Sequence, residues 1–159
     1  MPENAPINAT LRIVIDTNVF VSATLNRRSG SALIVNAWHV DKKFTLVTCR
    51  QAVNEILRVL AYPRIRIKYG VQPSEAYRIA EYLYKRAVWV EPKGEIDLCR
   101  DETDNFLLET AILGEADFLV SGDKDLVDDE KLKAKMLKHG VKVIGVAEFI
   151  GILRERGLI

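Results

Sequence analysis

Four acidic residues stand where predicted strands end or predicted helices begin. They are Asp16, Glu55, Asp104 and Asp123. In an open α/β sheet the carboxyl ends of the strands share one edge, and ligands bind there. If the four side chains converge at that edge, the like charges raise one another's pKa values, and a divalent cation removes the repulsion. Oxygen ligands of this kind suit the hard cations Mg²⁺ or Mn²⁺.

Each acid also has a purely structural interpretation. Asp16 and Asp123 follow apolar runs, where Asp commonly closes a turn or caps a helix. Asp104 at a helix N-terminus would interact favourably with the helix dipole, by about 0.3–1 kcal/mol. Glu55 could pair with Arg58, one helical turn later. The residues taken singly leave both interpretations open.

Neighbouring polar residues extend the candidate site. Asp125 is either a ligand for a second ion or a helix cap. Thr17 and Ser121 are candidates for hydroxyl groups that hold the carboxylates in place. Asn18 follows Asp16 by two residues, and Asn105 follows Asp104 directly, so either amide could orient a carboxylate or cap a helix.

Length and composition indicate an ordinary globular protein. The chain has 159 residues, of which 48% are hydrophobic and 28% charged, enough for one sizeable core. The net charge of +1 neither indicates nor excludes nucleic-acid binding, because a local cluster of basic residues can bind phosphates in a chain that is nearly neutral. Cys49 and Cys99 lack metal-ligand spacing, so we expect reduced thiols near the core of a cytoplasmic protein. We expect neither a membrane span nor a signal peptide.

Strands and helices are expected to alternate along the chain. Short apolar runs predict strands at 11–15, 44–48, 88–90, 117–120 and 141–144. Helical spacing of apolar residues predicts helices at 19–25, 31–40, 50–60, 73–87, 104–114, 131–138 and 147–156. Residues 64–68 fit neither pattern. The alternation predicts a parallel sheet with right-handed crossovers. We expect one domain at 11–156, after a flexible extension at 1–10.

The order of the acids is more specific than any one of them. Asp-Thr-Asn follows the first strand, a helical Glu comes next, Asp-Asn opens a later helix, and Ser-Gly-Asp follows the next strand. With these residues the chain resembles the PIN-domain nuclease family over about residues 11–156. The resemblance is strongest to the VapC-like toxins of bacterial and archaeal toxin–antitoxin pairs. The family's acids match Asp16, Glu55, Asp104 and Asp123, and its small hydroxyl residue matches Ser121.

The resemblance implies both a fold and an activity. The implied fold is a Rossmann-like, three-layer α/β/α sandwich with a central, mostly parallel, five-stranded sheet. The implied activity is an endoribonuclease that hydrolyses RNA with Mg²⁺ or Mn²⁺, bound by the four matched acids. The resemblance further implies a homodimer and an antitoxin partner that masks the acidic pocket.

Other residues agree with metal-assisted cleavage of RNA. His39 lies in an apolar helix and His139 in a lysine-rich stretch, so neither is expected to be a general base. Their placement favours metal-activated water. Tyr77 and Tyr84, seven residues apart on one helix, suit an interface. The basic candidates for holding RNA phosphates are Arg27, Arg28, Arg50, Arg58, Arg64, Arg66 and Lys68.

Rival functions fit the sequence less well. A phosphoryl-transfer hydrolase with a nucleophilic Asp commonly has a second Asp two residues on, where this chain has Asn18. A P-loop kinase is excluded because the chain has no Gly-x-x-x-x-Gly-Lys-Ser/Thr motif. The main alternative is a non-catalytic PIN-like scaffold that binds RNA or protein. The presence of all four acids favours the nuclease over that scaffold.

Overall fold

The computed structural model describes residues 10–98 and 102–159. In this part of the chain five strands form one sheet in the order β3-β2-β1-β4-β5, and every neighbouring pair is parallel. The strands are β1 (Arg12–Ile15), β2 (Thr45–Thr48), β3 (Val88–Trp89), β4 (Phe118–Ser121) and β5 (Lys142–Gly145). The predicted five-stranded parallel sheet is confirmed.

The strand order places a switch point between β1 and β4. From β1 the chain moves outward to β2 and then β3, and it returns to the other side of β1 for β4 and β5. In open α/β sheets ligands bind outside the carboxyl ends of the strands at such a reversal. Asp16 follows β1 and Ser121 ends β4, so both flank the reversal.

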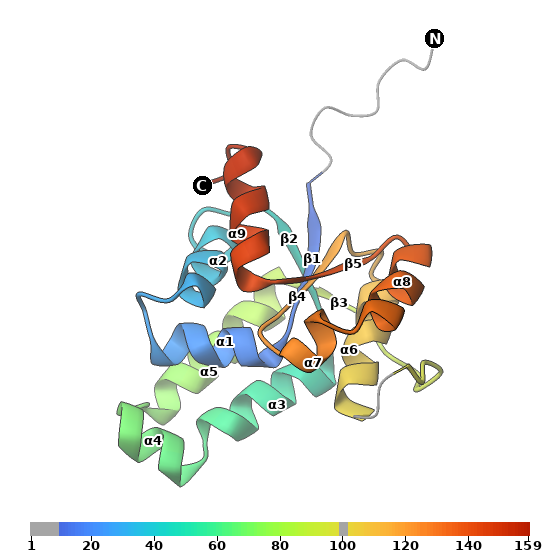
Figure 1. The fold of residues 1–159 in the computed structure, drawn as a ribbon. Coiled ribbons are helices and arrows are strands. Elements are labelled where there is room, and N and C mark those ends of the chain that lie inside the picture. Colours follow the sequence, from blue (N-terminus) through green and yellow to red (C-terminus); the bar gives the residue numbers. More distant parts are fainter. Residues whose placement is uncertain (1–9, 99–101) are drawn as a thin grey trace.

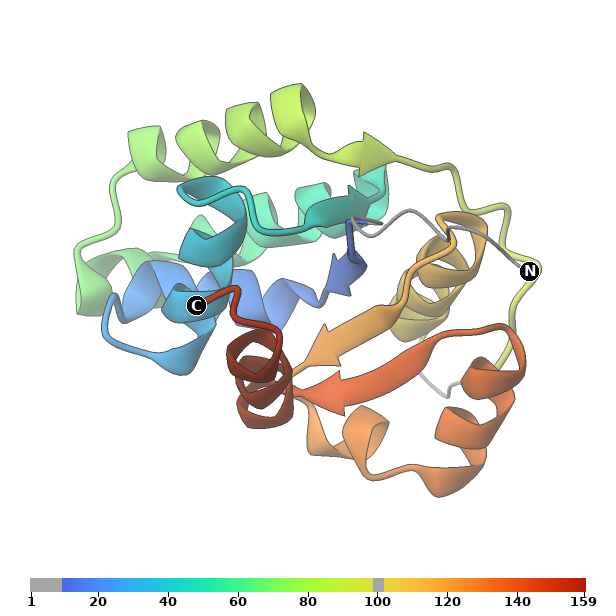
Figure 2. The same ribbon diagram turned by 90° about the horizontal axis from the view of Figure 1, so that it is seen from above.

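Helices cover both faces of the sheet, as Figures 1 and 2 show. They are α1 (Thr17–Leu25), α2 (Gly30–His39), α3 (Arg50–Leu60), α4 (Pro63–Tyr69), α5 (Pro73–Arg86), α6 (Glu102–Leu113), α7 (Lys124–Val127), α8 (Glu130–Lys138) and α9 (Val146–Glu155). The three layers of an α/β/α sandwich are therefore present, as expected.

Alternation along the strands separates two apolar cores. In β1, Ile13 and Ile15 face the core that contains residues of α1, α2, α3, α5 and α9. Val14 faces the opposite core, which contains residues of α6, α7 and α8. Buried parallel strands that carry apolar residues on both faces need helices on both sides. The acidic edge is thus held between two packed layers.

Two helices were not anticipated from the sequence. Residues 64–68, which fitted no pattern, lie in α4, which begins at Pro63 and ends before Gly70 in the left-handed conformation (φ 65°). Pro is well placed at a first helical turn, where its missing N–H is not needed. The short helix α7 is capped by Asp123, whose carboxylate accepts from the N–H of Asp125. Both helices are too short for a clear apolar period.

The structure also bears on the predicted start of α1, on the cysteines and on membrane-spanning helices. Helix α1 begins at Thr17, two residues before the predicted start, because Asp16 already takes the N-cap position. Cys49 is buried, as expected, whereas Cys99 and most of the expected N-terminal extension lie outside the described residues. Within residues 10–98 and 102–159, no helix is long and apolar enough to cross a membrane.

Candidate active site

Asp16 is held firmly at the end of β1. Its backbone N–H donates to the carbonyl of Val120 at 2.8 Å, which continues the β1–β4 pairing by one residue. The side chain is 7% exposed. Its Oδ2 accepts from the hydroxyl of Ser121 at 2.6 Å and from the amide of Asn18 at 3.3 Å. The predicted roles of Ser121 and Asn18 as partners of this carboxylate fit these contacts.

Ser121 also connects Asp16 to the segment after β4. The Ser121 hydroxyl oxygen accepts from the N–H of Asp123 at 3.0 Å. The N–H of Gly122 donates to Oδ1 of Asn18 at 3.1 Å. The start of α1 and the end of β4 are therefore tied together by two side chains. The Asp123 carboxylate itself accepts from the N–H of Asp125 at 2.9 Å, so the helix-cap interpretation of Asp123 holds in this structure.

Glu55 reaches the same region from α3. Its Oε2 accepts from the hydroxyl of Thr17 at 3.2 Å. Its Oε1 lies 3.8 Å from Nη2 of Arg58, so the anticipated ion pair forms, although the Arg58 side chain is 64% exposed. Exposed pairs of this kind contribute little to stability. Thr17 is buried and directly follows Asp16, so one turn of α1 positions the partners of both acids.

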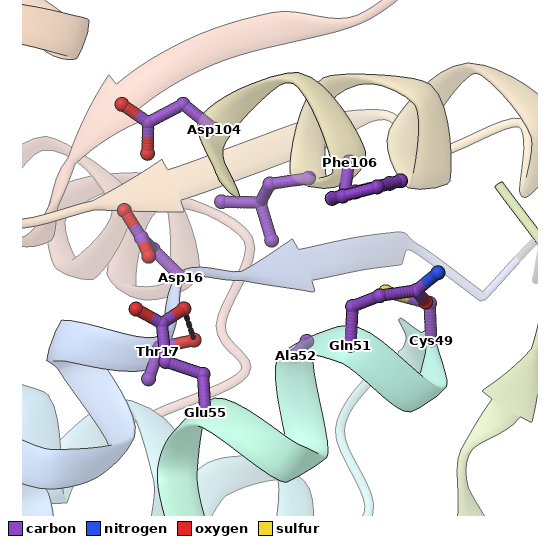
Figure 3. A pocket seen from close by; sticks show the side chains of 9 residues that line it. Asp16, Thr17, Cys49, Gln51, Ala52, Glu55, Asp104 and Phe106 are labelled. Atoms are coloured by element: carbon purple, nitrogen blue, oxygen red, sulfur yellow. Dashed lines mark hydrogen bonds between the residues drawn. The ribbon is translucent and has the colours of Figure 1, made fainter. Parts of the chain in front are cut away.

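Three of the four acids line one small pocket, shown in Figure 3. Asp16 comes from the end of β1, Glu55 from α3 and Asp104 from the first turn of α6. The remaining lining residues are Thr17, Cys49, Gln51, Ala52, Phe106 and Leu107. Its volume is about 10 Å³, roughly the space of one water molecule. Asp123 does not line the pocket and connects to it through Ser121.

The pocket disfavours negative charge on Asp16. Burial is the largest cause that raises the Asp16 pKa above its ordinary value of 3.8, and the charge of Glu55 adds to it. The hydrogen bond from Ser121 acts in the opposite direction, because it favours the ionised carboxylate. Ionisation of Asp16 is therefore less favourable in the folded protein than in a solvated chain.

The donor chemistry of the pocket fits a divalent cation, but its side chains do not form a complete coordination set. Carboxylate oxygens are the preferred ligands of hard cations, and a cation would favour the ionised form of Asp16, which burial and the charge of Glu55 disfavour. Over the described ranges, however, no group of three or more His, Cys, Asp or Glu side chains is arranged so that it could hold a metal ion. The structure therefore brings Asp16, Glu55 and Asp104 into one pocket, but it does not arrange them as a complete metal site.

Asn105 lies in a different environment from the one predicted. Its Oδ1 accepts from the N–H of Leu98 at 2.9 Å, so this side chain holds the segment before α6. One turn later, Glu109 is 4% exposed and accepts from the N–H groups of Lys93 at 2.7 Å and Gly94 at 3.0 Å. Sequence reasoning missed Glu109. A signal was available in the sequence: Asn105 and Glu109 are four residues apart, so the two polar side chains share one face of an otherwise apolar helix.

The predicted RNA-binding arginines are dispersed. Arg58 reaches Glu55, whereas Arg27 and Arg28 line a groove between α2 and α9 together with Arg154. Arg64 and Arg66 are exposed on α4.

The two histidines stay outside the acidic pocket. The His39 ring packs on Tyr82 with centroids 3.9 Å apart, and His139 is exposed after α8. Burial lowers the His39 pKa, and the charge of Arg86 lowers it further. A structural role for His39 and a surface position for His139 agree with the sequence analysis.

Comparison with known proteins identifies the family. The family model described as "PIN domain" matches residues 12–125. The chain belongs to the PIN domain family. The matched range contains Asp16, Glu55, Asp104 and Asp123, so the four acids lie within the PIN domain homology.

The chain is also similar to one curated relative and to chains of two solved structures. The PIN domain is 30% identical over 142 residues to the uncharacterised protein MJ1680 of Methanocaldococcus jannaschii, across 88% of this chain and 90% of that protein. It is similar to a chain in the crystal structure of VapBC2 from Rickettsia felis bound to a DNA fragment from their promoter. The TM-score is 0.49 and the identity 15%, and the match covers 85% of this chain and 98% of the other. It is also similar to a chain in the crystal structure of FitAcB from Neisseria gonorrhoeae. The TM-score is 0.48 and the identity 13%, and the match covers 84% of this chain and 97% of the other.

Proposed function

We propose that this PIN domain is a metal-dependent endoribonuclease that hydrolyses phosphodiester bonds in RNA. The observation that carries the proposal is the pocket beyond the carboxyl end of β1, where Asp16, Glu55 and Asp104 lie together. Three carboxylates from three separate elements are costly to assemble unless a cation uses them. Burial, together with the charge of Glu55, raises the Asp16 pKa, which agrees with such a cost.

The acids and their partners have distinct roles in this proposal. Asp16, Glu55, Asp104 and Asp123 would hold Mg²⁺ or Mn²⁺, which would supply activation of water and neutralise charge on the phosphate. Ser121 and Asn18 fix the orientation of the Asp16 carboxylate. Thr17 fixes that of Glu55. Glu55 would orient the attacking water or bind a second ion, and its Oε1 lies 3.8 Å from the exposed Arg58.

Cleavage of labelled single-stranded RNA tests the proposal. Wild-type protein with Mg²⁺ or Mn²⁺ should cleave, and EDTA should abolish cleavage. Asp16→Asn should lose about 100- to 1,000-fold in rate, as expected when a group that stabilises transition-state charge is removed. Asp128→Asn is the matched control, because Asp128 is an exposed acid just after α7 and should leave the rate unchanged. Cleavage that survives EDTA or Asp16→Asn would reject the proposed metal-dependent site, and no cleavage by wild-type protein would favour the non-catalytic scaffold.

The same proposal extends to a toxin controlled by an antitoxin. In this proposal an antitoxin holds the nuclease inactive in the cell by covering the acidic pocket. The resemblance to VapC-like toxins implies this partner. It also implies a homodimer, which we place in the cytoplasm. Induction of wild-type protein should arrest growth, and Asp16→Asn should not. Co-expression of a small protein encoded beside it should relieve the arrest. Light scattering on purified protein tests the dimer.

A further inference from the structure

A second groove lies beside the acidic pocket, and Gln51 lines both. The groove has a volume of about 590 Å³ and runs between the start of α3, the end of α5 and the edge strand β3. Its lining includes Arg50, Asn54, Tyr84 and Trp89. The nuclease chemistry described above makes no use of these residues. The following inference rests on the proposed ribonuclease function and extends it.

Two aromatic rings in the groove are exposed yet held in place. Trp89 is 38% exposed, and its indole N–H donates to the carbonyl of Leu83 at 3.2 Å. Tyr84 is 77% exposed and packs edge-on against Trp89, with ring centroids 6.3 Å apart and an interplanar angle of 61°. Because Trp89 is fixed by its own hydrogen bond and by its strand, its exposed face needs little ordering when a flat ligand stacks on it.

Arg50 and two amides of the groove complement a nucleic-acid strand, although the acidic residue Glu91 also lines the groove. Arg50 is exposed at the first residue of α3 and can pair with a phosphate. The exposed amides of Gln51 and Asn54 can hydrogen-bond base edges. An aromatic platform, a cation and amides in one groove are the usual components of single-stranded nucleic-acid sites. A protein partner could also use aromatic and arginine residues, but continuity with the acidic pocket through Gln51 favours the strand that is being cleaved.

We propose that this groove holds the single-stranded part of the RNA substrate next to the scissile phosphate, with separate bases stacked on Trp89 and on Tyr84 and a phosphate paired with Arg50. The groove would therefore set affinity for the substrate, while the acids perform the cleavage. The proposed specificity is for unpaired RNA, because a paired base cannot present its face to an aromatic side chain.

Tryptophan fluorescence in EDTA tests binding separately from cleavage. The probe is a single-stranded oligoribonucleotide of about ten nucleotides, within the usual site sizes of such grooves. Trp38 is 6% exposed, so its emission should stay constant while Trp89 is quenched. Trp89→Phe should abolish the quenching. A self-complementary hairpin without unpaired ends should quench much less.

The second readout is binding affinity. It is measured by fluorescence anisotropy with the same oligoribonucleotide carrying a fluorescent label. Trp89→Ala and Tyr84→Ala should each weaken binding by about 5- to 150-fold, the range for losing one stacked base. Tyr77→Ala is the matched control, because Tyr77 lies on the same helix, is 71% exposed and does not line the groove. In cleavage assays Trp89→Ala should raise KM and leave kcat near the wild-type value.

The outcomes separate this inference from the proposed function. Absence of quenching at saturating RNA, or equal affinity of Trp89→Ala and wild type, would reject the groove whether or not RNA is cleaved. A Trp89 emission that changes with protein concentration and not with RNA would assign the groove to a second copy of the chain. Quenching and weakened variants without any metal-dependent cleavage would reject the nuclease and retain RNA binding.

Discussion

The hydroxyl of Ser121 donates a 2.6 Å hydrogen bond to the carboxylate of Asp16, across 105 positions of the chain. Ser121 ends β4 and Asp16 directly follows β1, and these adjacent strands lie on either side of the switch point of the sheet. The same hydroxyl oxygen accepts from the N–H of Asp123. One small side chain thus sets the positions of two of the acids that we assign to the metal site.

Ser121→Ala should weaken both stability and activity. Ser121 is fully buried, so the variant leaves the Asp16 carboxylate and the Asp123 N–H without this partner, at a cost of about 1–3 kcal/mol in free energy of unfolding. Loss of a group that orients a ligand should reduce cleavage by about 10- to 100-fold. Urea denaturation and the RNA assay measure the two effects. Thr24→Ala removes a hydroxyl bonded only to its own helix at Phe20 and should leave cleavage unchanged. Equal effects of the two substitutions on cleavage would contradict the role of Ser121.

Asp16→Asn should stabilise the protein at neutral pH when no divalent cation is present. The folded-state pKa of Asp16 lies above its ordinary value of 3.8, so the folded protein holds this proton more firmly than the unfolded chain does. The free energy of unfolding therefore falls as pH rises from about 3.8 through the folded-state pKa, and the loss persists above it. Asn carries no charge and avoids this loss.

Melting temperatures of both proteins between pH 3 and pH 7 provide the measurement. The advantage of Asp16→Asn should grow with pH and disappear at the acid end. Added Mg²⁺ should raise the melting temperature of wild type more than that of the variant, because only wild type binds the ion well. A variant that is less stable than wild type at pH 7 in EDTA would show that Asp16 is a structural residue.

Glu109 should matter for stability rather than for metal binding. Glu109→Ala removes a buried acceptor from the N–H groups of Lys93 and Gly94 and should cost about 2–4 kcal/mol. Glu109→Gln keeps one good acceptor and should cost less. Glu95→Ala, an exposed acid of the same segment, is the control and should change little. Hydrogen exchange should accelerate at residues 93 and 94 in Glu109→Ala. Unchanged exchange there would contradict the assignment.

Two glycine substitutions should have opposite signs. An added Cβ at Gly114 would lie 2.3 Å from Cγ1 of Val47, a buried residue of β2, so Gly114→Ala should destabilise by about 1–3 kcal/mol. An added Cβ at Gly151 meets nothing within 4 Å in helix α9, so Gly151→Ala should stabilise by about 0.5–1 kcal/mol. Chemical denaturation measures both. Equal effects would mean that α6 and β2 are not packed as closely as the structure shows.

Residues with strong local signals were predictable from the sequence. The apolar strands and the long amphipathic helices follow from periodicity, and three of the four predicted acids, Asp16, Glu55 and Asp104, line one pocket. The short helices α4 and α7 could not be predicted, since a helix of this length has no clear apolar period. The long-range partners were also beyond the sequence: nothing local in Glu109 indicates that it binds Lys93 and Gly94, and nothing local in Trp89 indicates a neighbouring Tyr84.

The central claim is that separate carboxylates form one divalent-cation site, and anomalous scattering from crystals soaked in Mn²⁺ tests it most directly. We predict a manganese peak with carboxylate oxygens of Asp16 and Asp104 at about 2.0–2.6 Å, or one bridging water away, and no such peak in crystals of Asp16→Asn. The absence of a peak at the Asp16 pocket in wild-type crystals that bind manganese elsewhere would contradict the account.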